Sequence, residues 1–395
     1  MPTRRGLSSA GVYRDRGRTA AYLGGHVVLG LVTASLGPTI GGLATRVGGT
    51  AEALGWLFSV RAIGYLFGSL FAGRAYDKTA GHPILSATTA SLVALFLLVP
   101  AAHNTFSLAA ILLAIGAGQG VLDVGDNTLL SWVHGSKTGP FTSALSCFFG
   151  AGALLSTILV MLGKTTSSSY FLLALAIAPA TLLFGLTPSP DRPEPHTSIN
   201  TRLANPILIF LLAILFFLYQ GAEVSFGGWI FTYANAVGLS DKSATTLTSV
   251  FWSSFTLGRM LVIGMSVRIA PSRILLLSGA AALFGVSLIL VFPGSYAALF
   301  AGVMVVGFSL ASVLPMAISL AGRESLLSGR ITRFFLVSAS AGSMLLPWLI
   351  GRSFAFGPRG PMFVFLVDIV ALCFVFGLLS KQLVANQKTQ KMGSV

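Results

Sequence analysis

Two carboxylates, Asp123 and Asp126, lie three residues apart in an apolar segment, "GAGQGVLDVGDNTLLSW" (residues 116–132). On a helix they share one face with two further polar residues, Gln119 and Asn127, because the spacing is i, i+4, i+7 and i+8. Two carboxylates so close cannot both stay charged cheaply when they are partly desolvated. We therefore expect Asp123, Asp126 and Asn127 to exchange a proton or to hold a cation such as Na+, which prefers oxygen ligands. The sequence leaves the choice between H+ and Na+ open.

A third acid, Glu223, lies in the middle of another apolar run, with Gln220 one turn before it and Trp229 six residues after it. A buried sugar needs acceptors for its hydroxyls, because each unpaired hydroxyl costs ~1–3 kcal/mol, and an aromatic face for its C–H surface. These residues match that chemistry. The predicted substrate-binding residues are Gln119, Gln220, Glu223, Trp229, Tyr233, Trp252 and Ser253.

The elements that position these side chains are predicted to be membrane-spanning helices. The 395 residues are 54% apolar and only 9% charged, against roughly 25% charged residues in soluble domains. Apolar runs long enough to cross ~30 Å of hydrocarbon recur along the chain. They are residues 20–43, 54–74, 83–101, 106–133, 140–163, 168–187, 205–236, 244–267, 273–293, 295–321, 331–352 and 359–381. The predicted fold class is an all-α membrane protein with twelve transmembrane helices and the lipid bilayer as its surroundings.

The distribution of positive charge predicts the orientation. The net charge is +14, but Lys and Arg gather in alternate loops and at the two ends, between the apolar spans, so the charge is interpreted as an orientation signal and nucleic acid is not an expected partner. An excess of Lys and Arg on one side marks the cytoplasmic face, which predicts a multi-pass protein of the cell membrane with both termini cytoplasmic. Cys147 and Cys373 fall inside predicted spans, so we expect no disulfide framework.

A segment rich in Pro, Ser and charge, residues 188–204, divides the spans into two halves, 20–187 and 205–381. The remaining ends, 1–19 and 382–395, are predicted to be cytoplasmic tails. Sliding one half over the other by 190 positions matches Ser35 with Ser225, Gly37 with Gly227 and Ile40 with Ile230. This weak internal repeat predicts two parallel six-helix halves, related by an axis along the membrane normal.

The loop after the second span, "GRAYDKTAGHP" (residues 73–83), resembles the signature loop of the major facilitator superfamily. Gly73, Asp77 and Lys78 match the motif, whereas the later glycine is displaced by one place to Gly81 and His82 stands at a basic position. An acid beside a base at the mouth of the pathway can make and break a charged network as two halves rock. We assign gating to Gly73, Arg74, Asp77 and Lys78 of this loop and to Arg259.

Within the superfamily, three stretches resemble the branch of fucose:proton symporters and sodium-dependent glucose transporters: "GQGVLDVGDNTLL", "YQGAEVSFGGWIFTYA" and "FWSSFTLGR". This resemblance implies alternating-access symport of a hexose-like sugar with H+ or Na+. The first span departs from the fucose symporters, which carry an acid there; it offers only His26, Thr33 and Ser35. The coupling scheme of that family therefore cannot be transferred intact.

Other classes of function fit the same residues less well. An intramembrane aspartyl protease fails because Asp77 falls in a loop, so the protein is not expected to be an enzyme. A proton-coupled exporter of drugs or lipids remains the alternative. No nucleotide-binding or metal-binding motif stands out, so we expect no cofactor beyond the coupling ion. We also expect the protein to be a monomer.

The remaining intramembrane charges are expected to contribute to gating. Arg259 can pair with Asp126 or with Glu223. Arg61 and Asp368 lie in the outer halves of their spans and can form a gate on that side. Ionisable groups at such depth cost ~2.5–3.5 kcal/mol each on insertion scales, so a function is expected for each.

Overall fold

The chain folds into long helices that are suited to crossing a membrane. A computed structural model describes residues 9–135, 138–192, 205–324, 326 and 329–392. Within these residues, twelve helices are long and apolar enough to span a bilayer. The prediction of an all-α, twelve-span membrane protein is therefore confirmed.

Most spans begin and end within a few residues of the predicted bounds. The elements are α1 (Ser9–Val47), α2 (Trp56–Tyr76), α3 (Gly81–Leu98), η1 (Val99–Ala101), α4 (Thr105–His134), α5 (Thr138–Leu162), α6 (Thr166–Leu186), α7 (Pro206–Ala236), α8 (Asp241–Arg268), α9 (Pro271–Val291), α10 (Tyr296–Arg323), α11 (Gly329–Ser353), η3 (Phe354–Phe356) and α12 (Gly360–Met392).

Local signals set several of these bounds. Asn104 and Thr165 form capping boxes with Ser107 and Ser168, which satisfy free N–H groups at the starts of α4 and α6. At the other end of α4, Gly135 has φ 53°, a left-handed conformation that favours glycine and stops the helix. These caps fix both ends of α4, the helix that carries both aspartates.

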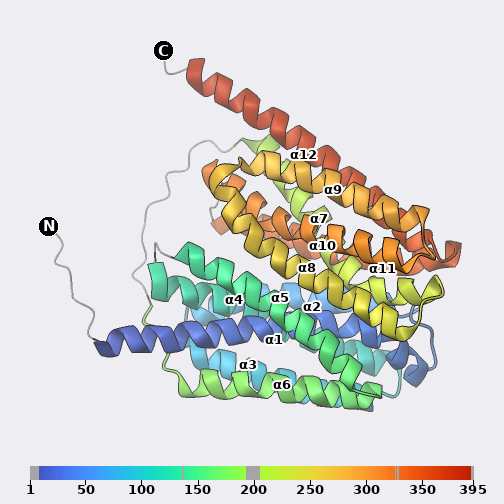
Figure 1. The fold of residues 1–395 in the computed structure, drawn as a ribbon. Helices are drawn as coiled ribbons and strands as arrows, with labels where there is room; N and C mark the ends of the chain where they lie inside the picture. The colour runs from blue at the N-terminus through green and yellow to red at the C-terminus, as the bar shows by residue number, and fades with distance from the viewer. Residues whose placement is uncertain (1–8, 136–137, 193–204, 325, 327–328, 393–395) are drawn as a thin grey trace.

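Two six-helix groups lie beside each other, α1–α6 in the lower part of Figure 1 and α7–α12 in the upper part. Helices α3 and α6 lie at one edge of the molecule, and α9 and α12 lie at the opposite edge. The start of α1 and the end of α12 lie on the same side, at the left of the figure. We call this the terminal side and the other end of the bundle the opposite side.

Small residues let the two halves approach closely in the middle and on the opposite side. A Cβ at Gly37 of α1 would lie 2.6 Å from the Gly228 carbonyl oxygen of α7. Ser59 of α2 donates a hydrogen bond to the Met344 carbonyl of α11 at 2.5 Å. Such contacts replace the hydrophobic effect, which does not act between helices in lipid.

Within the two predicted tails, the residues that the structure describes are helical. Helix α1 already begins at Ser9, and α12 continues to Met392. The extension of α12, residues 382–392, is rich in Gln and Lys, which are good helix formers, and contains no Gly or Pro. Of the predicted linker, residues 193–204 lie outside the described part of the chain.

The segment after α6 is attached to the terminal side of the first half. The Arg18 guanidinium donates to the carbonyl oxygens of Pro188 (3.0 Å) and Ser189 (2.7 Å). The ring of His82 lies within hydrogen-bond distance of the Thr187 carbonyl (2.6 Å) and of the Tyr22 hydroxyl (2.8 Å). His82, which replaces a basic residue of the signature loop, is thus a buried packing residue here.

Candidate functional site

A cavity of about 350 Å³ lies between the halves and is lined by both of them. This volume falls at the small end of the ~300–1,000 Å³ typical of ligand pockets. Its polar and charged lining comes from α1, α2, α4 and α5 on one side and from α7, α8 and α11 on the other. These residues include His26, Thr33, Arg61, Tyr65, Gln119, Asp123, Asn127, Gln220, Glu223, Arg259, Ser340 and Ser343.

His26 of α1 lies between the two aspartates of α4. Its Nδ1 is 3.0 Å from Oδ2 of Asp126, and its Nε2 is 3.8 Å from Oδ1 of Asp123. A protonated imidazole has an N–H on each nitrogen but a single positive charge, so His26 can face both carboxylates while it offsets the charge of only one of them. The first span therefore supplies a base, His26, whereas the resemblance to fucose:proton symporters predicts an acid in that span.

Asp123 faces the cavity and is held by two further side chains. Tyr65 of α2 donates its hydroxyl to Oδ2 of Asp123 at 2.5 Å. The amide of Asn127 donates to Oδ1 of Asp123 at 2.9 Å. The Asp123 side chain keeps 31% of its surface exposed, so water or an ion can reach it from the cavity.

Asp126 lies behind His26 and does not line the cavity. It is fully buried, and its Oδ1 has no hydrogen-bond partner among the described residues. Its Oδ2 is so close to α1 that a Cβ at Gly25 would lie 2.2 Å away, so only glycine fits there. Asp123 and Asp126 thus have different environments: one can exchange with the cavity, and the other binds His26.

A second charged group lies on the other half of the cavity. Glu223 of α7 accepts a hydrogen bond from the hydroxyl of Tyr219 and lies 3.9 Å from Nη2 of Arg259. The Arg259 guanidinium also lies 4.5 Å from the ring centre of Phe255 and 5.8 Å from that of Phe149 in the first half. Of the two partners predicted for Arg259, Glu223 is the one observed.

Arg61, Thr33 and Gln119 form a third polar group, on the first half. Nη1 of Arg61 donates to the carbonyl oxygens of Val32 (3.3 Å) and Thr33 (3.2 Å) in α1. The amide of Gln119 donates to the Thr33 hydroxyl at 3.0 Å. The predicted gate between Arg61 and Asp368 is not observed, because no ion pair joins them in the described structure and Asp368 is buried in α12.

The cavity opens toward the terminal side. Its lining there includes Asn127 and Thr142 of the first half and Ile318 of the second, and all three are exposed. The exposed fraction of Ile318 is 44%. A small ligand can therefore reach Asp123 and Glu223 from the terminal side in this conformation.

A layer around Trp229 separates the cavity from a second pocket on the opposite side. The Trp229 ring lies 5.4 Å from Phe58, which lines the cavity, and 5.4 Å from Phe354, which lines the second pocket. Its Nε1 donates to the Pro347 carbonyl at 2.8 Å. Cβ atoms at Gly55 and Gly351, which belong to different halves, would lie 2.9 and 2.7 Å from the indole.

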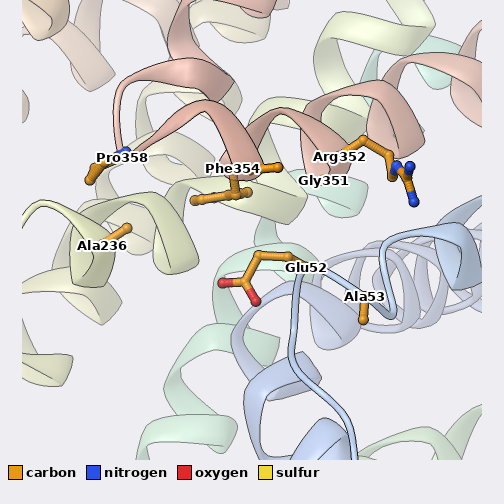
Figure 2. Close-up of a pocket in the computed structure, with 8 residues that line it drawn as sticks. Glu52, Ala53, Ala236, Gly351, Arg352, Phe354 and Pro358 are labelled. Atoms are coloured by element: carbon orange, nitrogen blue, oxygen red, sulfur yellow. The ribbon is translucent and has the colours of Figure 1, made fainter.

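The second pocket has a volume of about 570 Å³ and lies between this layer and the opposite side of the molecule. Figure 2 shows Glu52, from the loop before α2, reaching into it below Phe354, with Arg352 to one side. Gly351 belongs both to the pocket lining and to the contact with Trp229. We interpret this pocket as a vestibule on the opposite side that the Trp229 layer separates from the cavity.

Several predicted substrate contacts do not line the cavity in this conformation. Trp229 and Tyr233 are buried, Trp252 packs against Phe149 and Phe255, and half-buried Ser253 lies outside the lining. Aromatic residues on a helix serve equally for packing between helices, which is their role here. Gln119, Gln220 and Glu223 do line the cavity.

The signature loop forms a different network from the one predicted. Asp77 pairs with Arg192 of the segment after α6 (3.0 Å), while Gly73, Arg74 and Lys78 are exposed. Asp77 and Arg192 are both more than half exposed, and such surface pairs contribute only ~0–1 kcal/mol. A role of this loop in gating remains a prediction.

Sequence reasoning missed two tyrosines of the site. Tyr65 lies one turn after Arg61, and Tyr219 lies one turn before Glu223. Each donates to a cavity carboxylate. The i, i+4 spacing from an intramembrane charge is the signal that could have identified both.

We predict that Gly351→Ala shifts the protein toward a state that is open on the opposite side. The added Cβ would lie 2.7 Å from Trp229 and 3.3 Å from the Cα of Gly55 in the other half, so it should push the two halves apart at this layer. The reporter is Val224→Cys in the cavity lining, in a background without Cys147 and Cys373. A membrane-impermeant thiol reagent added on the opposite side should label it about tenfold faster in Gly351→Ala. This factor corresponds to a shift of ~1.4 kcal/mol in the equilibrium between the two conformations. Gly41→Ala is the control, because no atom lies within 4 Å of its Cβ. An unchanged labelling rate would contradict the closing role of Trp229.

A polar cavity between two six-helix halves, open on one side and closed on the other, is typical of secondary transporters. The chain belongs to the Major Facilitator Superfamily, whose family model matches residues 22–347. The family and the relatives that match the chain are transporters rather than enzymes, and the chain is an integral membrane protein.

Known proteins similar to the chain include sodium-dependent glucose transporters. Sodium-dependent glucose transporter 1 of Homo sapiens is 28% identical, with 84% of this chain and 72% of that protein covered. Sodium-dependent glucose transporter 1A of Mus musculus is 29% identical over 84% of this chain and 87% of that protein.

Two solved structures share the fold. A D-xylose-proton symporter aligns with a TM-score of 0.76 at 13% identity, covering 91% of this chain and 97% of that one. The nucleoside transporter NupG aligns with a TM-score of 0.70 at 15% identity, covering 93% and 99%.

Proposed function

We propose that the protein is a secondary transporter that couples the movement of a hexose-like sugar to that of a cation, in symport, by alternating access. The observation that carries this proposal is the pairing of two sites across one small cavity. His26, Asp123 and Asp126 supply an ion-exchanging group on one half, and Glu223 with Gln220 supplies hydrogen-bond acceptors and donors on the other. The names of the relatives also support a sugar as substrate.

We further propose that the terminal side faces the cytoplasm of a cell membrane, as the positive-inside rule predicts. The described conformation is then open to the inside. Closure of this side and separation of Trp229 from Gly55 and Phe58 of the first half would give the alternate state. We expect the transporter to work as a monomer without a cofactor, driven by the coupling ion alone.

Both H+ and Na+ have support as that ion. The position of His26 between Asp123 and Asp126 favours H+, because the imidazole already occupies the space between the carboxylates and can itself accept a proton. The relatives' names favour Na+. We propose H+ as the primary candidate, since His26 takes the position that a metal cation would need.

Uptake of radiolabelled hexose into proteoliposomes tests the proposal. Gradients of H+ and Na+ are imposed separately, and an ionophore that dissipates each gradient serves as its control. We expect accumulation above the outside concentration under the H+ gradient. Accumulation under the Na+ gradient alone would identify Na+ as the coupling ion. No accumulation under either gradient by folded protein would refute cation-coupled symport of a neutral hexose.

A further inference from the structure

Arg61 is a positively charged residue of the cavity lining that has no role in the proposed mechanism. It lies in α2, is only 6% exposed and lines the central cavity. Both hydrogen bonds recorded for its guanidinium use Nη1, which donates to Val32 and Thr33 carbonyls. Backbone carbonyls hold the side chain in place, but they do not neutralise its charge.

The other charged groups of the cavity have partners of opposite sign. Asp123 lies 3.8 Å from His26, and Glu223 lies 3.9 Å from Arg259. Among the ion pairs of the described residues, Arg61 occurs in none. A buried charge without a counter-charge is costly in a membrane protein and is expected to serve a ligand.

The free donors of Arg61 have a defined geometry. With Nη1 bonded to α1, the Nε and Nη2 groups have no protein acceptor among the described residues. A guanidinium presents such N–H groups as a planar fork, which matches the two oxygens of a carboxylate. Gln119 of the first half and Gln220 of the second also line the cavity and can bind hydroxyls.

We propose that the transported sugar is acidic, a hexuronate or an aldonate, and that Arg61 binds its carboxylate. This inference rests on the proposed sugar transport and specifies the substrate class. The anion completes the charge balance of the cavity, and the hydroxyls of the same molecule bind Gln119, Gln220 and Glu223. Tyr65, one turn after Arg61 on α2, connects this subsite to Asp123 and thus to the coupling ion.

Uptake of labelled glucuronate and glucose is compared in wild type, Arg61→Gln and Arg61→Lys. Arg268→Gln, which removes an equal charge from an exposed helix end, is the matched control. Loss of charge-assisted hydrogen bonds worth ~1.5–3 kcal/mol should raise the half-saturating glucuronate concentration of Arg61→Gln about 10–150-fold. Arg61→Lys keeps the charge without the fork and should fall between wild type and Arg61→Gln. The same acid should inhibit glucose uptake by wild type, which requires no variant to fold.

The outcomes separate this inference from the proposed function. If glucose accumulates in wild type but glucuronate and gluconate neither accumulate nor compete, sugar transport stands and the acidic-substrate inference is overturned. If no sugar accumulates at all, the proposed function fails. The carboxylate site is then tested by thermal unfolding of the protein, with glucuronate added in tenfold steps. Stabilisation of wild type but not of Arg61→Gln would support a carboxylate site, whereas equal or absent stabilisation would overturn it.

Discussion

Asp123→Asn is expected to abolish gradient-driven accumulation of substrate while exchange of substrate across the membrane continues. Asp123 is the carboxylate that faces the cavity, and its replacement by an amide removes the charge that a proton or cation must neutralise. Asn keeps the size of the side chain and can still bond Tyr65 and Asn127. Only the link between ion and substrate should therefore be lost.

The measurement is the accumulation ratio in proteoliposomes, together with the rate of counterflow of labelled substrate. Coupling free energies of 1–3 kcal/mol correspond to ~5–150-fold changes in affinity, so the ion should lose an effect of this size on substrate binding. Asp191→Asn, which removes an exposed carboxylate outside the cavity, should behave as wild type. An unchanged accumulation ratio in Asp123→Asn would exclude this residue from coupling.

Glu223→Gln is expected to cause the largest loss of stability among single changes in the cavity. Glu223 is the ion-pair partner of Arg259, and both side chains are buried. Removing one partner of a buried pair leaves an uncompensated charge, at a cost of about 3–5 kcal/mol. The temperature of unfolding in detergent should fall accordingly, and sugar uptake should be lost with it.

A double variant separates the effects of charge and of substrate binding. Glu223→Gln combined with Arg259→Gln removes both charges, so the unfolding temperature should recover most of the way to that of the wild type. Transport should not recover, because Glu223 is also the predicted hydroxyl acceptor. If the single and double variants are equally unstable, the contact at 3.9 Å is not an effective ion pair.

The structure changes how the acids of α4 are understood. The spacing predicts that Asp123 and Asp126 form one site, since both fall on one helical face. In the fold, His26 of α1 separates them, and Gly25 allows Asp126 to lie against α1 out of reach of the cavity. A pattern on one helix cannot show which neighbouring helix covers part of its face.

The aromatic residues show the same limit. The spacing of Gln220, Glu223 and Trp229 suggested one sugar site, but only the first two line the cavity. Trp229 lies six residues further along α7, where the halves meet. It packs there against Gly55, just before α2, and Gly351 of α11. Depth in the membrane and contact between halves are tertiary properties, which helical spacing does not contain.

What the sequence determined by itself is the membrane architecture and the chemistry available to the site. The twelve spans follow from the length of the apolar runs, because helices pair every backbone group within lipid and need about 20 apolar residues to cross it. The cost of burying charge identifies Asp123, Glu223, Arg61 and Arg259 as functional candidates. Tertiary structure alone decided the partners of these charges, the closed layer at Trp229 and the side on which the cavity opens. Those features depend on contacts between helices far apart in the chain, whose packing is set by shape and not by local pattern.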